Sequence, residues 1–379
     1  MKIAVYAIYK NEPHELEGFL HSACDADYVL ICDTGGDTGG AAKNALHVPG
    51  VHIQNICVNP WRFDKARDAA LALLPSDIDV CIALDMDERL EPGWREEIER
   101  IWVLGETTRM RYLFDWGSGI QFKAEKIHTR NGYRWHHPVH EQLRPDLRVP
   151  EVWAETDKLL ITHHPDPTKS RGQYLDLLKL SVQEDPNCPH NAFYYARELY
   201  FYARHEDAIV EAKRYLNLPG ATWNHERAFA WRVIAKSHAA LEQDDQARPA
   251  FLTAIKAAPH LREARVEYSQ YLHDKKDWPL CLSQALAALS ITDKQLDYTM
   301  DPSAWGAWPF DLASIAAFNL GNYSTAFEFV NKALDLDPTN KRIAANYIKM
   351  RDAATAPTLE PTPAKQTREI WVNIYKDGA

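Results

Sequence analysis

The sequence predicts an α/β part followed by an all-α part built from helical repeats. In the first half, short apolar runs alternate with stretches that have a helical pattern. These runs are apolar throughout, as in strands buried on both faces, so we expect a mainly parallel sheet covered by helices. In the second half, small residues recur at a fixed spacing, which is typical of stacked helix pairs.

The elements of the first half follow one another in a regular order. We expect strands over 2–8, 28–32, 51–58 and 80–84. Between and after these strands we expect helices over 13–25, 40–46, 64–74 and 91–103. A mixed region rich in aromatic and basic residues follows, with strand-like pieces at 108–114 and 158–162. This order predicts a Rossmann-like domain over residues 1–165.

Four segments after His164 share one spacing of small residues. A small residue is followed by a second one 12 positions later and by an alanine or apolar position seven further on; the sets are Ala196/Ala208/Tyr215, Ala235/Ala247/Ala254, Ser269/Cys281/Ala288 and Ser314/Ala326/Ala333. The middle positions lie 39, 34 and 45 residues apart, which indicates the tetratricopeptide period with insertions. Small residues let paired helices approach closely, and each pair buries its apolar face against its neighbours. We expect a tetratricopeptide-like array over residues 166–352, with a generic helical bundle as the alternative.

The composition limits the classes of partner and compartment. A chain of 379 residues is long enough for two cores, and its net charge of −10 argues against a general nucleic-acid-binding surface. The six cysteines form no CxxC pair, so we expect reduced thiols and a cytoplasmic location. No apolar stretch approaches the roughly 20 residues that span a bilayer, and no signal peptide is expected. Residues 353–379 read as a proline-rich linker and a strand-like tail.

Three carboxylates follow the apolar run at 80–84. They are Asp85, Asp87 and Glu88, and such a cluster is costly unless a cation neutralises it. Magnesium takes oxygen ligands, often one or two carboxylates together with substrate phosphates. Ligands of open α/β sheets bind just beyond the carboxyl ends of the strands. We therefore expect a metal that holds a diphosphate here; the alternative is an acidic turn before the following helix.

Polar residues also follow the first two predicted strands. Asp33 opens a glycine-rich turn after the second strand, and Glu12 follows the first strand. An acidic side chain at this place can accept hydrogen bonds from a ribose or a base, while the glycines let the backbone approach a ligand. If the strands that precede Asp33 and Asp85 lie side by side, their ends are about 5 Å apart. The alternative for Asp33 is a plain turn.

Arg67 lies on the predicted helix over 64–74. It either faces the diphosphate or pairs with Asp64 or Asp68 on the same helix. The aromatic side chains of Trp116, Trp135 and Trp153 are candidates for stacking on sugar rings, although tryptophan is also a common core residue.

Together these pieces resemble the inverting GT-A glycosyltransferases of family 2. The residues that carry the resemblance are 7–12, 26–35, 63–68 and 83–88. More narrowly, the chain is similar to a bacterial and phage subgroup with a tetratricopeptide tail, which includes relatives of lipopolysaccharide-core glucosyltransferases and peptide S-glycosyltransferases. Residues 139–143 and 161–164 are also similar to blocks of this subgroup. The resemblance extends to about Met350.

The resemblance implies roles for the acidic residues at the strand ends. Glu12 and Asp33 would hold the nucleotide, and Asp85 and Asp87 would form the Asp-x-Asp pair, with Asp87 favoured as the direct metal ligand. Such enzymes use Mg²⁺ or Mn²⁺ to bridge the donor diphosphate, most often that of UDP. His164 or His163 would complete the metal or phosphate site; a histidine pair at a domain junction is the alternative reading.

Inverting transfer also needs a base that removes the proton of the acceptor, and a carboxylate is the ordinary choice. Glu141 is our candidate, with His140 beside it to orient or tune it, and Asp115 is the competing base. This assignment departs from the family pattern, in which the base lies in a later acidic pair on a helix.

The leading expectation is a metal-dependent transferase that moves a hexose from a nucleotide sugar to a glycan, a protein or a modified nucleic-acid base. The helical array is expected to present the acceptor or to form an interface with a second copy or a protein partner. A nucleotidyltransferase is a second class, but it would need a glycine-rich basic loop where Asn11-Glu12-Pro13 stands. A third class is a non-catalytic tetratricopeptide adaptor on a degenerate transferase domain.

Overall fold

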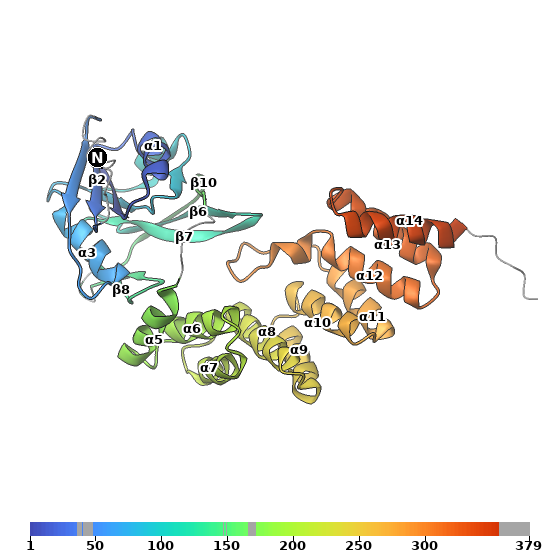
Figure 1. Ribbon diagram of the computed structural model, residues 1–379. Helices are drawn as coiled ribbons and strands as arrows, with labels where there is room; N and C mark the ends of the chain where they lie inside the picture. Colours follow the sequence, from blue (N-terminus) through green and yellow to red (C-terminus); the bar gives the residue numbers. More distant parts are fainter. Residues whose placement is uncertain (36–39, 41–47, 147, 149, 166–171, 356–379) are drawn as a thin grey trace, which may run out of the picture.

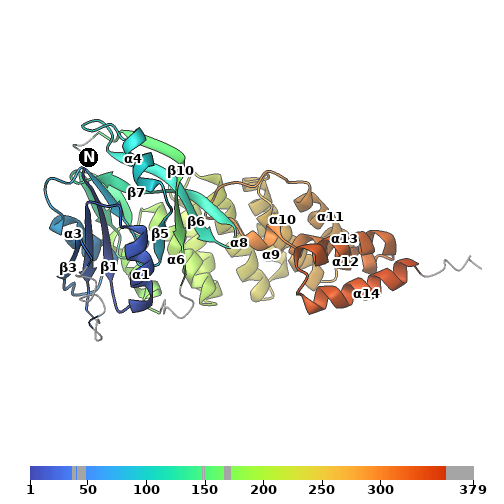
Figure 2. The ribbon, with the colours of Figure 1, turned by 90° about the horizontal axis from the view of Figure 1, so that it is seen from above.

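The computed structural model describes residues 1–35, 40, 48–146, 148, 150–165 and 172–355 (Figure 1). An α/β part built on an eight-stranded sheet is followed by a row of antiparallel helix pairs that leads away from it. Figure 2 shows from above how these pairs succeed one another from α6 to α14. The predicted helix over 40–46, apart from Gly40, and the chain beyond residue 355 lie outside the described residues.

The sheet has a parallel half and a mixed half, in the order β3-β2-β1-β4-β7-β6-β10-β5. The parallel half consists of β1 (Ile3–Tyr9), β2 (Tyr28–Asp33), β3 (Val51–Asn55) and β4 (Val80–Ala83). The mixed half consists of β5 (Glu88–Leu90), β6 (Arg109–Gly117), β7 (Ile120–Thr129) and β10 (Trp153–His163). The expectation of a mostly parallel sheet is confirmed, since β6 and β10 also run parallel. The antiparallel neighbours of β7 and β5 were not expected.

Helices cover both faces of the parallel half, as expected for strands without apolar alternation. Ile3 and Val5 of β1 point to the face that packs on Phe19 of α1 (Pro13–Ser22) and on α4 (Trp94–Ile101). Ala4 and Tyr6 point to the other face, which packs on Ala70 of α3 (Phe63–Leu73). Alternate residues of one strand therefore belong to two separate cores.

A small hairpin packs beside α3 on the second face. It is formed by β8 (Tyr133–His136) and β9 (Gln142–Pro145). Trp135 of this hairpin is buried, and its indole N–H donates to the hydroxyl of Tyr6 over 2.9 Å. The hairpin thus places the loop at 137–141 next to the sheet.

The helical part contains ten α-helices among the described residues. They are α5 (Tyr174–Glu184), α6 (Pro189–Phe201), α7 (His205–Asn217), α8 (Asn224–Ala240), α9 (Asp244–Ala257), α10 (Glu263–Asp274), α11 (Trp278–Leu289), α12 (Trp308–Asn319), α13 (Tyr323–Leu336) and α14 (Lys341–Thr355). All twelve positions of the predicted repeat are at most 2% exposed. The hydroxyl of Ser269 donates to the carbonyl of Cys281 over 2.9 Å, which shows how closely such helices approach. The repeat prediction is confirmed.

The longest step of the repeat contains an insertion between α11 and α12. This segment, residues 290–307, includes the short helix η2 (Pro302–Trp305). It returns to the α/β part, where the ammonium of Lys294 donates to the carbonyl of Gly119 over 2.9 Å. The ring of Tyr298 also contacts Phe122 of β7 edge to face, with 6.0 Å between ring centres.

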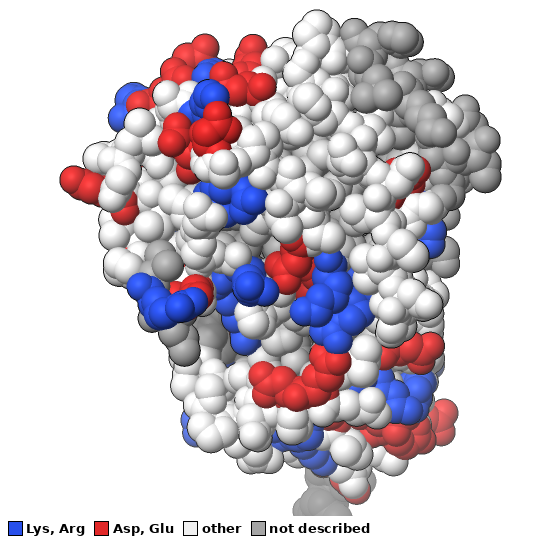
Figure 3. All heavy atoms as spheres, turned by 90° about the vertical axis from the view of Figure 1, so that its left-hand side faces the viewer, with Lys and Arg blue, Asp and Glu red and all other residues white. Residues whose placement is uncertain are grey.

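The remaining expectations concern thiols, membranes and surface charge. All six cysteines are free thiols, in agreement with the sequence. Among the described residues, no helix is both long and apolar enough to cross a bilayer. Figure 3 shows basic and acidic side chains next to one another on one face of the α/β part, with no continuous basic surface there.

Candidate functional site

The parallel strands bring the predicted acidic residues to one edge of the sheet. Glu12 follows β1, Asp33 ends β2, and Asp85 follows β4. Strand β1 lies between β2 and β4, so Asp33 and Asp85 are not on neighbouring strands but two strand spacings apart, about 10 Å. The carboxylate of Asp33 accepts a hydrogen bond from the amide of Gly35 over 2.9 Å, which closes the turn after β2.

Arg67 occupies the centre of this edge. Its guanidinium reaches from α3 to the carboxylates of both Asp85 and Glu141, and it lies 5.0 Å from the ring centre of Trp135. Burial lowers the pKa of Arg67, but the two carboxylates outweigh burial and hold that pKa above its ordinary value. Arg67 therefore faces the strand ends, and its ion-pair partners are Asp85 and Glu141 instead of Asp64 or Asp68.

The two aspartates on the same helix have other partners. Asp64 pairs with Arg62 over 2.8 Å, and Asp68 accepts a hydrogen bond from the backbone amide of Trp135 over 2.8 Å. These contacts leave α3 with one cation directed at the site.

A second cation comes from β7, and the sequence did not point to it. The ammonium of Lys126 donates to Glu88 over 2.6 Å and lies 3.3 Å from Asp85. Burial lowers the pKa of Lys126, whereas Asp85 and Glu88 raise it, and the net shift is upward. Burial also raises the pKa of Glu88. The three clustered carboxylates are thus tolerated partly because the protein supplies its own cations.

Asp87 faces a histidine, but it is His163 and not His164. The imidazole Nε2 of His163 lies 3.6 Å from the carboxylate of Asp87, and the ring stacks on Trp116 with 4.2 Å between centres. Burial lowers the pKa of His163, Asp87 raises it, and the net shift is upward. The side chain of His164 is exposed and lies 3.2 Å from the hydroxyl of Thr162, while its backbone amide donates to the carbonyl of Asp87.

The carboxylates of this cluster suit a metal ion only if a bound ligand supplies further oxygen atoms. In the described part of the chain, no three His, Cys, Asp or Glu side chains lie close enough to enclose a metal by themselves. The described members of the cluster include four carboxylates, namely Asp85, Asp87, Glu88 and Glu141, against the cations Arg67 and Lys126. A hard cation bound through one or two carboxylates and phosphate oxygens fits this negative set.

The two candidate bases are placed differently. Glu141 is largely buried and joined to Asp85 through Arg67, so it belongs to the acidic edge. Asp115 lies on β6, where it accepts hydrogen bonds from the amide of Gly117 and from the side chain of Gln121 over 2.8 and 2.9 Å. These contacts tie Asp115 to the β6–β7 hairpin. The ring of His140 stacks on Tyr194 of α6, with 4.1 Å between centres.

Of the three candidate tryptophans, Trp116 alone is exposed next to the acidic edge. Its side chain is 41% exposed beside His163. Trp135 is buried beneath Arg67, and Trp153 lies under the guanidinium groups of Arg109 and Arg111.

A separate cavity of about 220 Å³ lies between α3, the β8–β9 hairpin and α5. It is lined by four basic and four acidic residues together with His136 and His137. Its charges balance, and the candidate residues Asp85, Asp87 and Glu141 do not line it. The cavity therefore marks the boundary between the two parts and not the acidic edge.

Comparisons with known proteins concern the helical part. No family model and no curated protein matches the chain. Among solved structures, it is similar to YrrB, a tetratricopeptide protein with an unusual peptide-binding site (19% identity, TM-score 0.35, 47% of this chain and 82% of that one). It is also similar to pilF of Pseudomonas aeruginosa (12%, 0.36, 46% and 71%) and to yeast Tom70 (17%, 0.37, 49% and 37%). Scores this low carry no argument about function, and the tetratricopeptide-like assignment rests on the buried repeat positions.

Proposed function

We propose that this protein is a divalent-cation-dependent glycosyltransferase that moves a hexose from a nucleotide sugar, UDP-linked, to an acceptor with inversion. The observation that supports the proposal is the joint position of Glu12, Asp33, Asp85 and Asp87 at the carboxyl edge of the parallel strands. Ligands of open α/β sheets bind at this edge.

The donor is assigned to the strand ends. Asp33 and Glu12 follow neighbouring strands and accept hydrogen bonds from the nucleoside, while the diphosphate lies near Arg67 and Lys126. Asp85 and Asp87 would hold Mn²⁺ or Mg²⁺ against the phosphates. When bound, the metal offsets negative charge on the departing nucleoside diphosphate.

Glu141 is assigned as the base. It removes the proton of the acceptor nucleophile as that atom attacks the sugar carbon and the bond to the diphosphate breaks. Arg67 orients Glu141 from one side, since its guanidinium is held between Glu141 and Asp85. The exposed ring of Trp116, beside His163, offers a surface on which an acceptor stacks.

Thermal shift with a panel of nucleotide sugars tests this function. We expect one UDP-sugar to raise the melting temperature only when Mn²⁺ is present. A ligand at one hundred times its dissociation constant adds about 2.7 kcal/mol, which corresponds to roughly 5–10 °C for a domain of this size. Asp87→Ala should abolish the shift, with Asp77→Ala, an exposed pair with Lys2, as the matched control.

Other results of the same panel decide between the alternatives. A response to nucleoside triphosphates alone would indicate a nucleotidyltransferase. No response to any nucleotide, with or without metal, would refute the proposal and favour a non-catalytic adaptor.

The adaptor is the second candidate because the helical array exposes large apolar side chains. Phe201, Val210 and Leu252 are 61%, 67% and 52% exposed on α6, α7 and α9. Exposed apolar side chains of this size, where they adjoin one another, mark binding surfaces for proteins. Under this reading the array binds a protein or peptide and the acidic edge has no catalytic role.

A further inference from the structure

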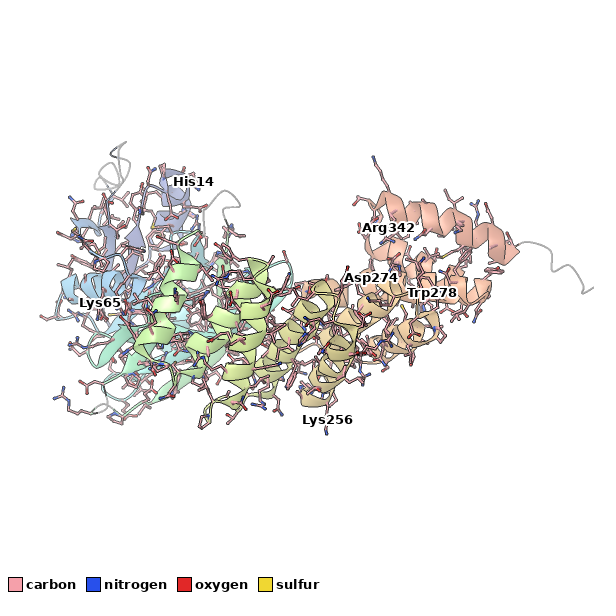
Figure 4. All side chains as sticks on the ribbon, turned by 60° about the horizontal axis from the view of Figure 1, so that its bottom comes forward. His14, Lys65, Lys256, Asp274, Trp278 and Arg342 are labelled. Atoms are coloured by element: carbon pink, nitrogen blue, oxygen red, sulfur yellow. The ribbon has the colours of Figure 1, made fainter. Side chains whose placement is uncertain are left out.

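The loop that carries Glu141 is held by the helical array. Figure 4 shows helices α5 and α6 against the α/β part, and several of the contacts between the two parts involve the loop at 137–141 and Gln142, the first residue of β9. This loop connects β8 and β9 and belongs to the α/β part. Its neighbours on the other side of the boundary include Tyr174 of α5 and His190 and Tyr194 of α6.

The backbone of this loop is strained. His137 and His140 have φ values of 80° and 49°, in the left-handed region that side chains with a Cβ rarely adopt. Such a conformation is costly and persists only when its surroundings fix it. From the α/β part, the amide of Phe63 donates to the carbonyl of Pro138 over 3.0 Å. The side chain of Glu141 is held by Arg67 of α3, whereas the residues on either side of it contact α6.

One imidazole binds the residues on both sides of Glu141. The Nε2 of His190 lies 2.7 Å from the carbonyl of His140, and because a carbonyl only accepts, Nε2 carries the proton. Its Nδ1 is then the acceptor for the side-chain amide of Gln142 over 2.9 Å. Burial lowers the pKa of His190 to about 4, so the neutral ring that these two hydrogen bonds require is the form present at neutral pH.

Aromatic stacking adds to these two hydrogen bonds. The ring of His140 lies on Tyr194 with 4.1 Å between centres and 20° between planes, and it meets Tyr174 of α5 edge to face. The ring of His137 stacks on His190 at 5.5 Å. Three side chains of the array thus hold both strained residues of the loop.

We propose that His190 is a positioning residue for Glu141, supplied to the transferase site by the helical array. The proposal rests on the function proposed above, and it makes α6 a component of the active site. His190 does not touch the reacting atoms. It holds the backbone carbonyl of His140 and the side chain of Gln142, on either side of Glu141, so that the carboxylate stays against Arg67.

The test uses the full chain with His190→Ala, His190→Gln and a matched control. His238→Ala removes another buried histidine of the array, one that is hydrogen-bonded to Gln243 within α8 and its following turn. Two quantities are measured. The first is Mn²⁺-dependent release of UDP from the UDP-sugar that stabilises the chain, and the second is amide hydrogen exchange of residues 137–142.

We expect His190→Ala to lower kcat by about 10- to 100-fold, the loss that is typical when a residue that orients a functional side chain is removed. The KM for the donor should stay within about threefold, since Glu12, Asp33 and Asp87 are unchanged. Exchange in the loop should become about tenfold faster. His190→Gln, which retains a donor and an acceptor, should restore most of both quantities, and His238→Ala should change neither.

The two measurements separate failure of this proposal from failure of the proposed function. Unchanged loop exchange in His190→Ala, or faster exchange with an unaltered kcat, would overturn the positioning role. A chain that neither binds nor cleaves any nucleotide sugar would refute the transferase, and the catalytic part of this proposal with it. In that case, faster loop exchange in His190→Ala would show only that His190 stabilises the contact between the α/β part and the helical array.

Discussion

Two arginine clusters in this molecule differ in the sign of the charge that prevails among their described residues and in their exposure. In the helical array, Arg232 and Lys236 both pair with Glu267, and the side chains of Arg232 and Glu267 are each 4% exposed. At the edge of the sheet, Arg67 is shared by Asp85 and Glu141, and the side chain of Asp85 is 35% exposed. The first cluster is closed, with two cations on one carboxylate. The second, the open cluster, is partly exposed through Asp85, and its described residues include four carboxylates and the two cations Arg67 and Lys126.

The difference shows what distinguishes a structural ion pair from a candidate site. Burial would raise the pKa of Glu267, but Arg232 and Lys236 outweigh burial and lower that pKa to about 2. At the sheet edge, burial raises the pKa of Glu88 in spite of Lys126. A cluster in which the described carboxylates prevail and one of them, Asp85, is exposed offers oxygen ligands to an added cation, whereas the one carboxylate of the array pair is already held by two cations.

The largest expected effect concerns the open cluster. Glu141→Gln keeps the shape of the side chain but removes its basicity, so we expect kcat to fall by about 10²- to 10⁴-fold. The thermal shift produced by the UDP-sugar and Mn²⁺ should remain. Asp115→Asn is the matched comparison, and a larger loss of kcat there than in Glu141→Gln would transfer the role of base to Asp115.

Disrupting the closed cluster should affect stability and not the donor. Glu267→Ala leaves Arg232 buried without its carboxylate, and we expect a loss of about 3–5 kcal/mol in the free energy of unfolding, measured with urea. Glu328→Ala removes an exposed carboxylate paired with Lys332 in the same array, and it should cost less than about 1 kcal/mol. Equal losses in the two variants would show that the buried and the exposed ion pair contribute equally to stability.

The closed cluster should also respond to acid. The folded pKa of Glu267 is about 2 and its ordinary value is 4.5, so the stabilisation is present above pH 4.5 and is lost as the pH falls toward 2. This corresponds to on the order of 3 kcal/mol. In urea unfolding, the difference between the unaltered chain and Glu267→Gln should shrink over that interval. A difference that stays constant between pH 5 and pH 2 would rule out this assignment.

The smallest expected effect is at the exposed rim of the open cluster. Trp116→Ala removes a ring that stacks on His163, and aromatic contacts of this kind contribute about 0.5–1.5 kcal/mol. We expect the KM for an acceptor to rise by up to about tenfold, with the donor shift unchanged. Trp223→Ala, an exposed tryptophan of the array, serves as the control. A loss of the donor shift in Trp116→Ala would instead indicate that Trp116 orders Asp87.

The sequence predicted correctly the structural features that depend on short stretches of the chain, namely the buried strands and the close helix pairs. The uniformly apolar strands placed Glu12, Asp33 and Asp85 at one edge, and the spacing of small residues placed Ala208 and Ala326 in helix contacts. These predictions succeeded because a buried strand or a close helix pair restricts residue type position by position.

Features set by distant partners were not predictable in the same way. Lys126 lies in a strand with charged neighbours, and nothing local shows that it reaches Asp85 and Glu88. The choice of His163 over His164 depends on the direction in which β10 ends. The contact between His190 and the carbonyl of His140 joins residues about 50 positions apart, one in the helical array and the other in the α/β part. The antiparallel strand β7 was missed because its charged residues interrupt the apolar pattern.

The insertion at residues 290–307 has a mechanical consequence. Because Lys294 and Tyr298 contact the tip and flank of the β6–β7 hairpin, the α/β part is attached to the array at α5 and α6 and again more than a hundred residues later. A body fixed at two distant points cannot swing about either one. The irregular step in the repeat therefore adds a second attachment that limits movement of the α/β part relative to the array.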